Sequence, residues 1–259
     1  MNRKILKHLS LHNLISDRQY GFRQGRSTGD HLAFLTESWS STFRDFGETL
    51  ALDISKAFDR VWHKSLIFIL LSYSFYPSLC KFISSFLSDR SIVAVVDGHC
   101  SSSKSVNSVV PQGSVLSPTL FLLFINDLLN QSSCPLHSYA DDTTLHLSTS
   151  FQRRPTLQEV IRSRRDATER LTSDLSKISY WGRENSVVFK ASKTQFLHLS
   201  TRHNLPDNYP LFFNHTQLSP SSTLDILGSP KQKANLNEEF FYVRKKSWSR
   251  TTKNRKRPT

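Results

Sequence analysis

Two adjacent aspartates, Asp141 and Asp142, constrain the fold of this chain more than any other feature. They end the tetrad Tyr139-Ala-Asp-Asp142, and Leu145 and Leu147 then alternate with polar residues. This pattern predicts a β-hairpin with both carboxylates at its turn. Neighbouring carboxylates repel each other, and a divalent cation is the usual compensation. The alternative is an ordinary turn, which aspartate favours because it bonds to its own backbone.

A second apolar segment, Thr49-Leu-Ala-Leu-Asp-Ile54, predicts another strand and places Asp53 near its end. The residues from Ser55 to Val61 indicate a corner between this strand and a helix. Two strands that each present a carboxylate at one point of a sheet fit a paired Mg²⁺ phosphoryl-transfer site, in which the ions lie roughly 3.5–4 Å apart. Asp59 lies further along, on the helix, and is assigned a structural role.

A third unusual segment is Pro111-Gln-Gly-Ser-Val-Leu-Ser-Pro118, which leads into an apolar helix expected over residues 119–129. Gly113 has no Cβ, so such a loop can bring its backbone close to a ligand. The segment also reads as a helix start, with Ser117 as the N-cap and Pro118 in the first helical position. The two interpretations are compatible.

The rest of the pattern indicates an α+β or α/β protein, because strand-like and helix-like segments alternate before residue 200. Pro77 is expected to divide one long helical segment into two helices. We expect helices over residues 30–43, over 65–87 with a break at Pro77, and over 157–181. We expect strands over 91–97, over 187–189 and 195–199 as a pair, and a weak one over 210–213.

Charge and composition narrow the class of protein. The chain has 34 Lys+Arg against 21 Asp+Glu, a net charge of +13, which predicts attraction to a polyanion such as nucleic acid. The three cysteines are widely spaced, so neither a zinc ribbon nor a disulfide framework is expected. The apolar run 66–71 is far shorter than the roughly 18 residues of a membrane span, and we expect a soluble intracellular protein that does not associate with membranes.

The C-terminal segment is expected to be a disordered tail, because a block of like charge cannot offset its ordering entropy by burial. Its two basic clusters resemble a two-part nuclear import signal, although such a tail also arises by accident. Eight of the net charges lie there: Arg244, Lys245, Lys246, Arg250, Lys253, Arg255, Lys256 and Arg257.

Taken in order, Asp53 to Val61, Pro111 to Pro118 and Tyr139 to Asp142 resemble the palm motifs of reverse transcriptases, most closely those of jockey-like non-LTR retrotransposons of the LINE type. Residues 19–28 resemble the segment between fingers and palm in that family, and residues 193–199 resemble the segment after its active site. Several motifs in the right order are far more specific than any one of them.

The resemblance implies an α+β fold, a polymerase right-hand palm with partial fingers. We expect partial fingers over 1–48, the palm over 49–228 and an unrelated basic tail over 229–259 in place of a thumb. We also expect a domain truncated at both ends, without the outer fingers strands or an endonuclease. Val109 or Val110 replaces a glycine that relatives usually carry, which predicts a shifted loop if φ must be positive.

The resemblance also implies the catalytic residues. Asp53 and Asp141 match the metal-binding aspartates, Asp142 completes the pair, and the Ile54 carbonyl is a further ligand, so that together they hold two Mg²⁺ ions. Lys193 matches a lysine proposed as general acid to the leaving pyrophosphate, with a surface lysine as the alternative.

Substrate contacts are implied at five further positions. Phe58 matches the residue that favours deoxynucleotides, with a core aromatic as the alternative. Gln112 and Gly113 match the loop that touches the template and the new base pair. Arg23 and Arg26 match basic residues near the template or nucleotide, with free surface charge as the alternative.

The function implied is that of an RNA-directed DNA polymerase, with an RNA template, a DNA primer and deoxynucleoside triphosphates as partners. The primer 3′-hydroxyl would attack the α-phosphate of the incoming nucleotide at the two-metal site. The alternatives are a catalytically dead nucleic-acid-binding protein of retroelement origin and a non-functional fragment. The sequence carries no prediction of the oligomeric state.

Overall fold

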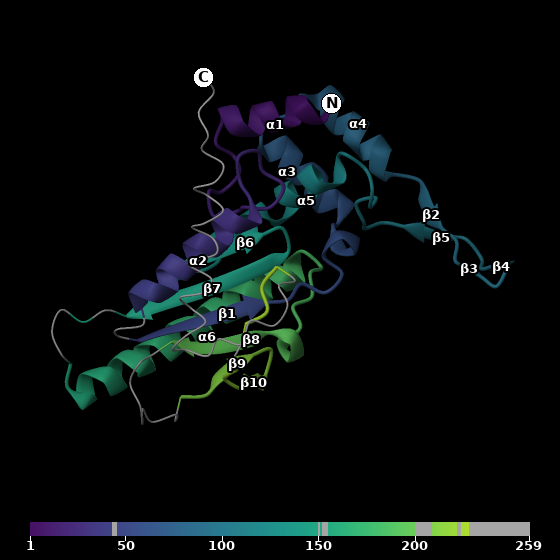
Figure 1. Cartoon of the computed structure of the whole chain (residues 1–259). Helices are drawn as coiled ribbons and strands as arrows, with labels where there is room; N and C mark the ends of the chain where they lie inside the picture. Colours follow the sequence, from purple (N-terminus) through teal and green to yellow (C-terminus); the bar gives the residue numbers. More distant parts are fainter. Residues whose placement is uncertain (43–45, 150, 152–154, 200–208, 222–223, 228–259) are drawn as a thin grey trace, which may run out of the picture.

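The computed structural model describes residues 1–42, 46–149, 151, 155–199, 209–221 and 224–227. A four-stranded antiparallel sheet in the order β6-β7-β1-β8 forms its centre (Figure 1). The four strands are β6 (Leu136–Tyr139), β7 (Asp142–Thr149), β1 (Phe46–Leu52) and β8 (Gln195–Leu199).

Two helices cover opposite faces of this sheet, α2 (Thr28–Thr42) and α6 (Leu157–Glu184). Thr49 is paired with His146, so both side chains lie on one face, where Thr42 of α2 also bonds to the His146 ring. The neighbouring residue Glu48 points to the other face, where the charge of Arg164 on α6 acts on it.

The length of α6 follows from its sequence. Thr156 and Glu159 form a capping box at its N-terminus, which satisfies backbone N–H groups that would otherwise lack partners. Its buried residues recur at helical intervals and form one stripe against the sheet. They are Val160, Arg164, Ala167, Leu171, Asp174, Leu175, Ile178, Trp181 and Gly182.

A helical lobe packs above the sheet in Figure 1. Its central helix, α5 (Ser117–Ile125), has an almost wholly apolar sequence and is buried nearly all round. The other members are α1 (Asn2–Leu11), α3 (His63–Ser72), α4 (Pro77–Leu87) and the 3₁₀ helix η2 (Asn126–Asn130). Ile5 and Leu9 of α1 belong to the same core as the sheet, and the expected boundary between residues 48 and 49 lies within β1.

Two small hairpins and two short helices complete the described chain. A thin ribbon projects from the body, with β2 (Arg90–Ile92) paired to β5 (Lys104–Val106) and, further out, β3 (Val95–Val96) to β4 (His99–Cys100). The second hairpin joins β9 (Leu211–Phe213) and β10 (Thr216–Leu218), and the 3₁₀ helices are η1 (Ala57–Arg60) and η3 (Ala191–Lys193).

The structure confirms the α+β class, the hairpin, the break at Pro77 and the long helix α6. Of the two carboxylates expected at the turn, Asp141 lies there, whereas Asp142 begins β7 and pairs with Tyr139. The expected helix over 30–43 is α2, although residue 43 lies outside the described residues, as does the expected tail. Across the described residues, no helix combines the length and the apolarity needed to cross a membrane.

Three predictions of local structure were wrong. The expected strand over 91–97 is broken between β2 and β3, because its residues are exposed and have no core face to hold one register. Residues 187–189 do not pair with β8; Phe189 forms only a bridge to Ile54, and β8 instead completes the sheet beside β1. The N-cap of α5 is Leu116, because the Ser117 hydroxyl donates to the Pro111 carbonyl, 2.6 Å away.

Candidate active site

The sheet brings the predicted carboxylates together. Leu52 at the end of β1 pairs with Thr143 near the start of β7, so the next residue, Asp53, lies beside the turn that carries Asp141 and Asp142. Asp53 and Asp142 line one small hollow of about 70 Å³, together with Lys193 and Asp225. The convergence expected from two separate apolar segments is therefore present in the structure.

The carboxylates of the turn are electrostatically unfavourable without a counterion. Burial raises the pKa of Asp141, and the charge of Asp53 raises it further. Burial also raises the pKa of Asp142, to which the charges of Asp141 and Asp53 add, while the backbone N–H of Leu227 lowers it. A cation between these groups would relieve both the repulsion and the loss of hydration.

Asp53 provides a direct test of whether these residues fit a cation. Its Oδ2 is shielded from solvent and has no hydrogen-bond partner among the described residues. The Lys193 ammonium lies 3.8 Å from that oxygen, beyond hydrogen-bond distance, and is itself exposed. A buried carboxylate oxygen without a hydrogen bond is a site that a metal ion can fill.

The ligand set is not closed around one point in this conformation. Within the described segments, no three potential metal-binding side chains lie close enough to hold one ion. Ile54 is buried at the same corner and forms an isolated bridge to Phe189.

Phe58 lies on η1 and is half-buried. Its ring stacks on Phe121 of α5 with centroids 4.4 Å apart and meets Phe22 edge-on at 6.1 Å. The core-aromatic interpretation is thus part of the structure, and the exposed portion of the ring remains available for a ligand.

The loop before α5 exposes Gln112 and Gly113 to solvent, and Gly113 has a φ of 87°. The loop is closed by the Ser114 N–H and the Ser117 hydroxyl, which both donate to the Pro111 carbonyl. Val109 just before it has a φ of 136°, a value that is strained for a β-branched residue.

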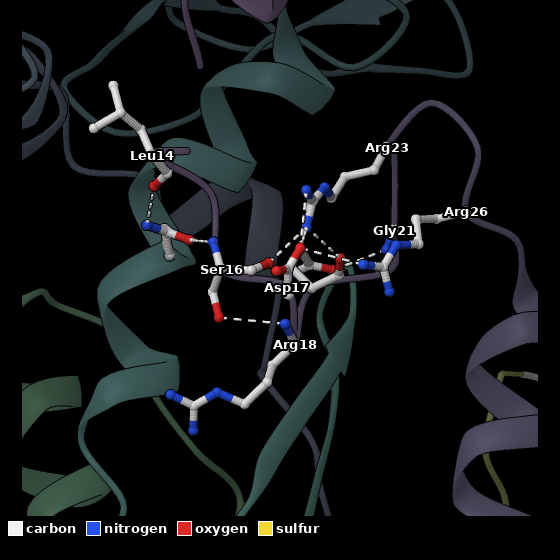
Figure 2. Close-up of polar contacts among 9 residues, drawn as sticks. Leu14, Ser16, Asp17, Arg18, Gly21, Arg23 and Arg26 are labelled. Carbon is white, nitrogen blue, oxygen red and sulfur yellow. Dashed lines mark hydrogen bonds and ion pairs between the residues drawn. The ribbon is translucent and has the colours of Figure 1, made fainter. Parts of the chain in front are cut away.

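Arg23 and Arg26 are held by the protein itself (Figure 2). Their guanidinium groups approach the carboxylate of Asp17 to 3.4 and 3.2 Å, and Arg23 also donates to the Ser16 carbonyl at 2.7 Å. Arg26 lies over the Tyr20 ring, 5.0 Å from its centroid. Arg23 lines a separate hollow of about 480 Å³ beside α1.

Sequence reasoning missed four residues that contact the site. Asp225 lines the hollow, and Leu227 donates its backbone N–H to Asp142. Gln19 and Gly21 contact the turn at Ala140. Backbone contacts leave no signal in side-chain type, whereas the buried Gln19 lies within the segment 19–28 that resembles a family motif.

Two solved structures with a similar fold are telomerases. The apo telomerase of Candida tropicalis truncated from its C-terminal domain has a TM-score of 0.52 and 11% identity, covering 89% of this chain and 44% of that one. The telomerase of the same organism in complex with the TWJ fragment of telomeric RNA has a TM-score of 0.51 and 13% identity, covering 91% and 37%. At such identities the similarity shows the fold alone, which is that of a polymerase palm and fingers.

The sequence then defines the family. Residues 1–231 match the model of the reverse transcriptase (RNA-dependent DNA polymerase) family, and this chain belongs to that family. It is 33% identical over 163 residues to the RNA-directed DNA polymerase from mobile element jockey of Drosophila melanogaster, which covers 55% of this chain and 18% of that protein. It is also 34% identical over 151 residues to the probable RNA-directed DNA polymerase from transposon BS of the same organism, covering 53% and 16%.

These comparisons confirm the predicted resemblance to jockey-like non-LTR elements. The chain spans less than a fifth of the length of these two relatives. Polymerases of the reverse transcriptase family generally use divalent metal ions.

Proposed function

We propose that this chain forms the catalytic palm of an RNA-directed DNA polymerase, which extends a DNA primer on an RNA template with deoxynucleoside triphosphates. The observation that carries the proposal is that Asp53 and Asp142, which follows Asp141 in the turn, line one hollow, and that a buried Asp53 oxygen has no hydrogen-bond partner among the described residues. Family membership supports the same reaction. In this assignment residues 1–48 are partial fingers and residues 49–228 are the palm.

The metal in this proposal is Mg²⁺, bound as two ions by Asp53, Asp141, Asp142 and the Ile54 carbonyl. The ions would supply neutralising charge for the triphosphate and a lower pKa for the primer hydroxyl. Lys193 would donate a proton to the leaving pyrophosphate, and its ammonium already lies within the site, 3.8 Å from Asp53.

The remaining proposed contacts surround this centre. Phe58 would exclude a 2′-hydroxyl with the exposed part of its ring, and Gln112 and Gly113 would touch the template and the new base pair from their exposed loop. Arg23 and Arg26 would contact template or nucleotide phosphates, which requires them to share or leave Asp17. The net charge of +13 favours nucleic-acid binding in general, and a similar fold is solved with a fragment of telomeric RNA.

The test is primer extension by the purified chain on an RNA template with Mg²⁺ and deoxynucleotides. We expect Asp141→Asn, alone or with Asp142→Asn, to lower the rate by about a thousandfold, because several kcal/mol of charge stabilisation is lost. Asp127→Asn, at an exposed acid on η2, is the matched control and should keep the parent rate. Equal extension by the parent and all variants would refute the site. No extension by any of them, together with equal RNA binding by all, would indicate a nucleic-acid-binding protein.

We also propose that the basic clusters of residues 244–257, which lie outside the described residues, act as a nuclear import signal. The full chain fused to a fluorescent protein should enter nuclei. Replacing Lys253, Arg255, Lys256 and Arg257 with glutamine should retain the fusion in the cytoplasm, and unchanged nuclear entry would refute the proposal.

A further inference from the structure

The segment from Ser16 to Gly21 runs along the free edge of β6, next to the catalytic turn. The Tyr20 N–H donates to the Ser138 carbonyl at 2.8 Å, and the Ser138 N–H donates to the Arg18 carbonyl at 2.9 Å. These two bonds align Gln19 with Ser138 as a parallel bridge. The segment therefore extends the sheet at the strand that leads directly into the turn.

Gln19 lies at the centre of this contact and is almost fully buried, with 1% of its surface exposed. Its amide oxygen accepts from the backbone N–H of Ala140 at 2.9 Å and from that of Gly21 at 2.8 Å. Its amide nitrogen lies 3.4 Å from the Ala140 carbonyl, to which it donates. One side chain thus binds both peptide groups that flank Ala140, the residue immediately before Asp141.

The backbone at Ala140 needs such support. Its φ is 58°, in the left-handed region that costs an L-residue roughly 1–2 kcal/mol. A Cβ on Gly21 would lie 2.3 Å from the Ala140 nitrogen, so only glycine permits this approach. The Ser138 hydroxyl adds a bond of 2.8 Å to the Ala140 carbonyl.

The segment is anchored at a distance from the turn. Asn126 of η2 accepts from the Ser16 N–H at 2.9 Å and donates to the Leu14 carbonyl at 2.8 Å. On the other side, Figure 2 shows Asp17 between Arg23 and Arg26, which closes the loop that follows. Gln19 therefore connects the turn to the helical lobe through a fixed backbone.

We propose that Gln19 is a positioning residue for the candidate active site. By binding both peptide groups of Ala140 it fixes the direction in which the Asp141 carboxylate leaves the turn, and so its approach to Asp53. This inference rests on the proposed function, because the quantity that Gln19 controls is the metal affinity of the carboxylates. Groups that orient metal ligands typically contribute about 10–100-fold to metal affinity.

The test compares Gln19→Met with Gln131→Met in the full chain. Methionine keeps the length of the side chain and removes its polar atoms. Gln131 is the matched control, because among the described residues its side-chain amide donates hydrogen bonds only to Asp127, four residues earlier. The first measurement is amide hydrogen exchange at Ala140 by NMR, which should be protected in the parent and in Gln131→Met and should lose protection in Gln19→Met.

The second measurement is Mn²⁺ affinity by electron paramagnetic resonance, well below the melting temperature of every variant. We expect about tenfold weaker binding for Gln19→Met and no change for the control. In an Asp141→Asn background, Gln19→Met should weaken binding no further, because both changes act on the same ligand. A lower melting temperature with unchanged Mn²⁺ affinity would show a purely structural role and overturn the proposal.

Two further outcomes are decisive. If Gln19→Met does not fold, Gln19→Asn replaces it; this variant keeps a polar amide in the buried position but shortens its reach by one methylene, so it should lose protection at Ala140 and bind Mn²⁺ more weakly. Unchanged protection and affinity in a folded Gln19→Asn would overturn the proposal. If the parent binds no Mn²⁺, the proposed function fails, and the positioning role fails with it, while exchange at Ala140 still shows whether Gln19 fixes the turn.

Discussion

The turn at Tyr139–Asp142 and the loop at Pro111–Ser117 are both singled out by sequence, but they are held in opposite ways. The turn is bound by Gln19, which lies 121 residues away in the chain. The loop is closed by its own residues, since Ser114 and Ser117 both bond to the Pro111 carbonyl. The tip of the loop is exposed, whereas Ala140 in the turn is buried.

The difference corresponds to what each segment is proposed to do. Metal ligands must keep a nearly fixed geometry, and distant contacts provide this because the turn cannot move without disturbing several elements. A loop that touches a new base pair at every step meets four different bases, so bonds confined to the loop let it adjust without disturbing the core. Four comparisons of variants test this contrast.

The largest expected effect separates the two glycines. Gly21→Ala places a Cβ 2.3 Å from a backbone nitrogen of the turn, which should destabilise the fold by about 3 kcal/mol. At Gly113 a Cβ would meet no atom of the described residues within 4 Å, and the φ of 87° opposes alanine at a cost of about 1 kcal/mol. Urea unfolding of both variants measures this difference. Equal decreases in the free energy of unfolding would show that the turn accommodates a Cβ as easily as the loop does.

The second effect is the acid sensitivity of the turn. His31 stacks on Tyr20 at 4.8 Å and faces Tyr139 at 6.4 Å, and burial lowers its pKa to about 4. Because this pKa is below the unfolded value of 6.5, its contribution to stability is complete above pH 6.5 and is lost as the pH falls toward 4. Between pH 7 and 5 the free energy of unfolding should fall by about 2 kcal/mol more in the parent than in His31→Phe.

The measurement is the urea midpoint at both pH values, with His99→Phe on the exposed ribbon as the control. Part of the acid sensitivity should persist in His31→Phe, because burial also lowers the pKa of His137 to about 4. The same loss in parent and His31→Phe would exclude this stack as the sensitive element.

The third effect concerns strain beside the loop. Val109 has a φ of 136°, and Val109→Gly should stabilise the fold by about 1 kcal/mol, because the relief of strain exceeds the added freedom of the unfolded chain. Val115→Gly provides the control, since Val115 is exposed in the same loop and has no positive φ. Calorimetry should show a higher melting temperature for the first variant and a slightly lower one for the second; the reverse order would remove the strain argument.

The smallest effect is a gain in stability at the turn itself. The raised pKa of Asp142 means that its stabilising contribution is present at low pH and is lost as the pH rises through that pKa. Asp142→Asn should therefore raise the free energy of unfolding at pH 7 by less than about 1 kcal/mol and melt at a slightly higher temperature, and the difference should vanish below about pH 4. A lower melting temperature at pH 7 would show that the Leu227 N–H outweighs the repulsion.

Local pattern was sufficient to predict much of this fold. Alternation around Leu145 predicted β7, the proline at Pro77 predicted a helix boundary, and helical spacing predicted α6. The convergence of Asp53 with the turn could be predicted because Asp53 and the aspartates of the turn both lie at the ends of predicted strands. The strand, the helix boundary and the long helix each depend on residues close together in the chain.

The features that were missed depend on distant partners. Nothing in residues 195–199 specifies β1 as their neighbour, and an adjacent apolar segment at 187–189 was the nearer candidate. In the sequence Gln19 looks like an ordinary polar residue, and its role becomes visible only in the fold, where it lies beside Ala140. Periodicity reports which face is buried but not which strand lies alongside.

The central position of β1 has a consequence for synthesis of the chain. His146, which bonds to Thr49, is synthesised 97 residues after it, and β8, the other neighbour of β1, is synthesised later still. At about 5–20 residues per second, a ribosome needs roughly 5–20 s to deliver the first partner strand. During that interval β1 has two open edges and no sheet to join, so the yield of folded protein should depend on chaperones that shield a nascent strand.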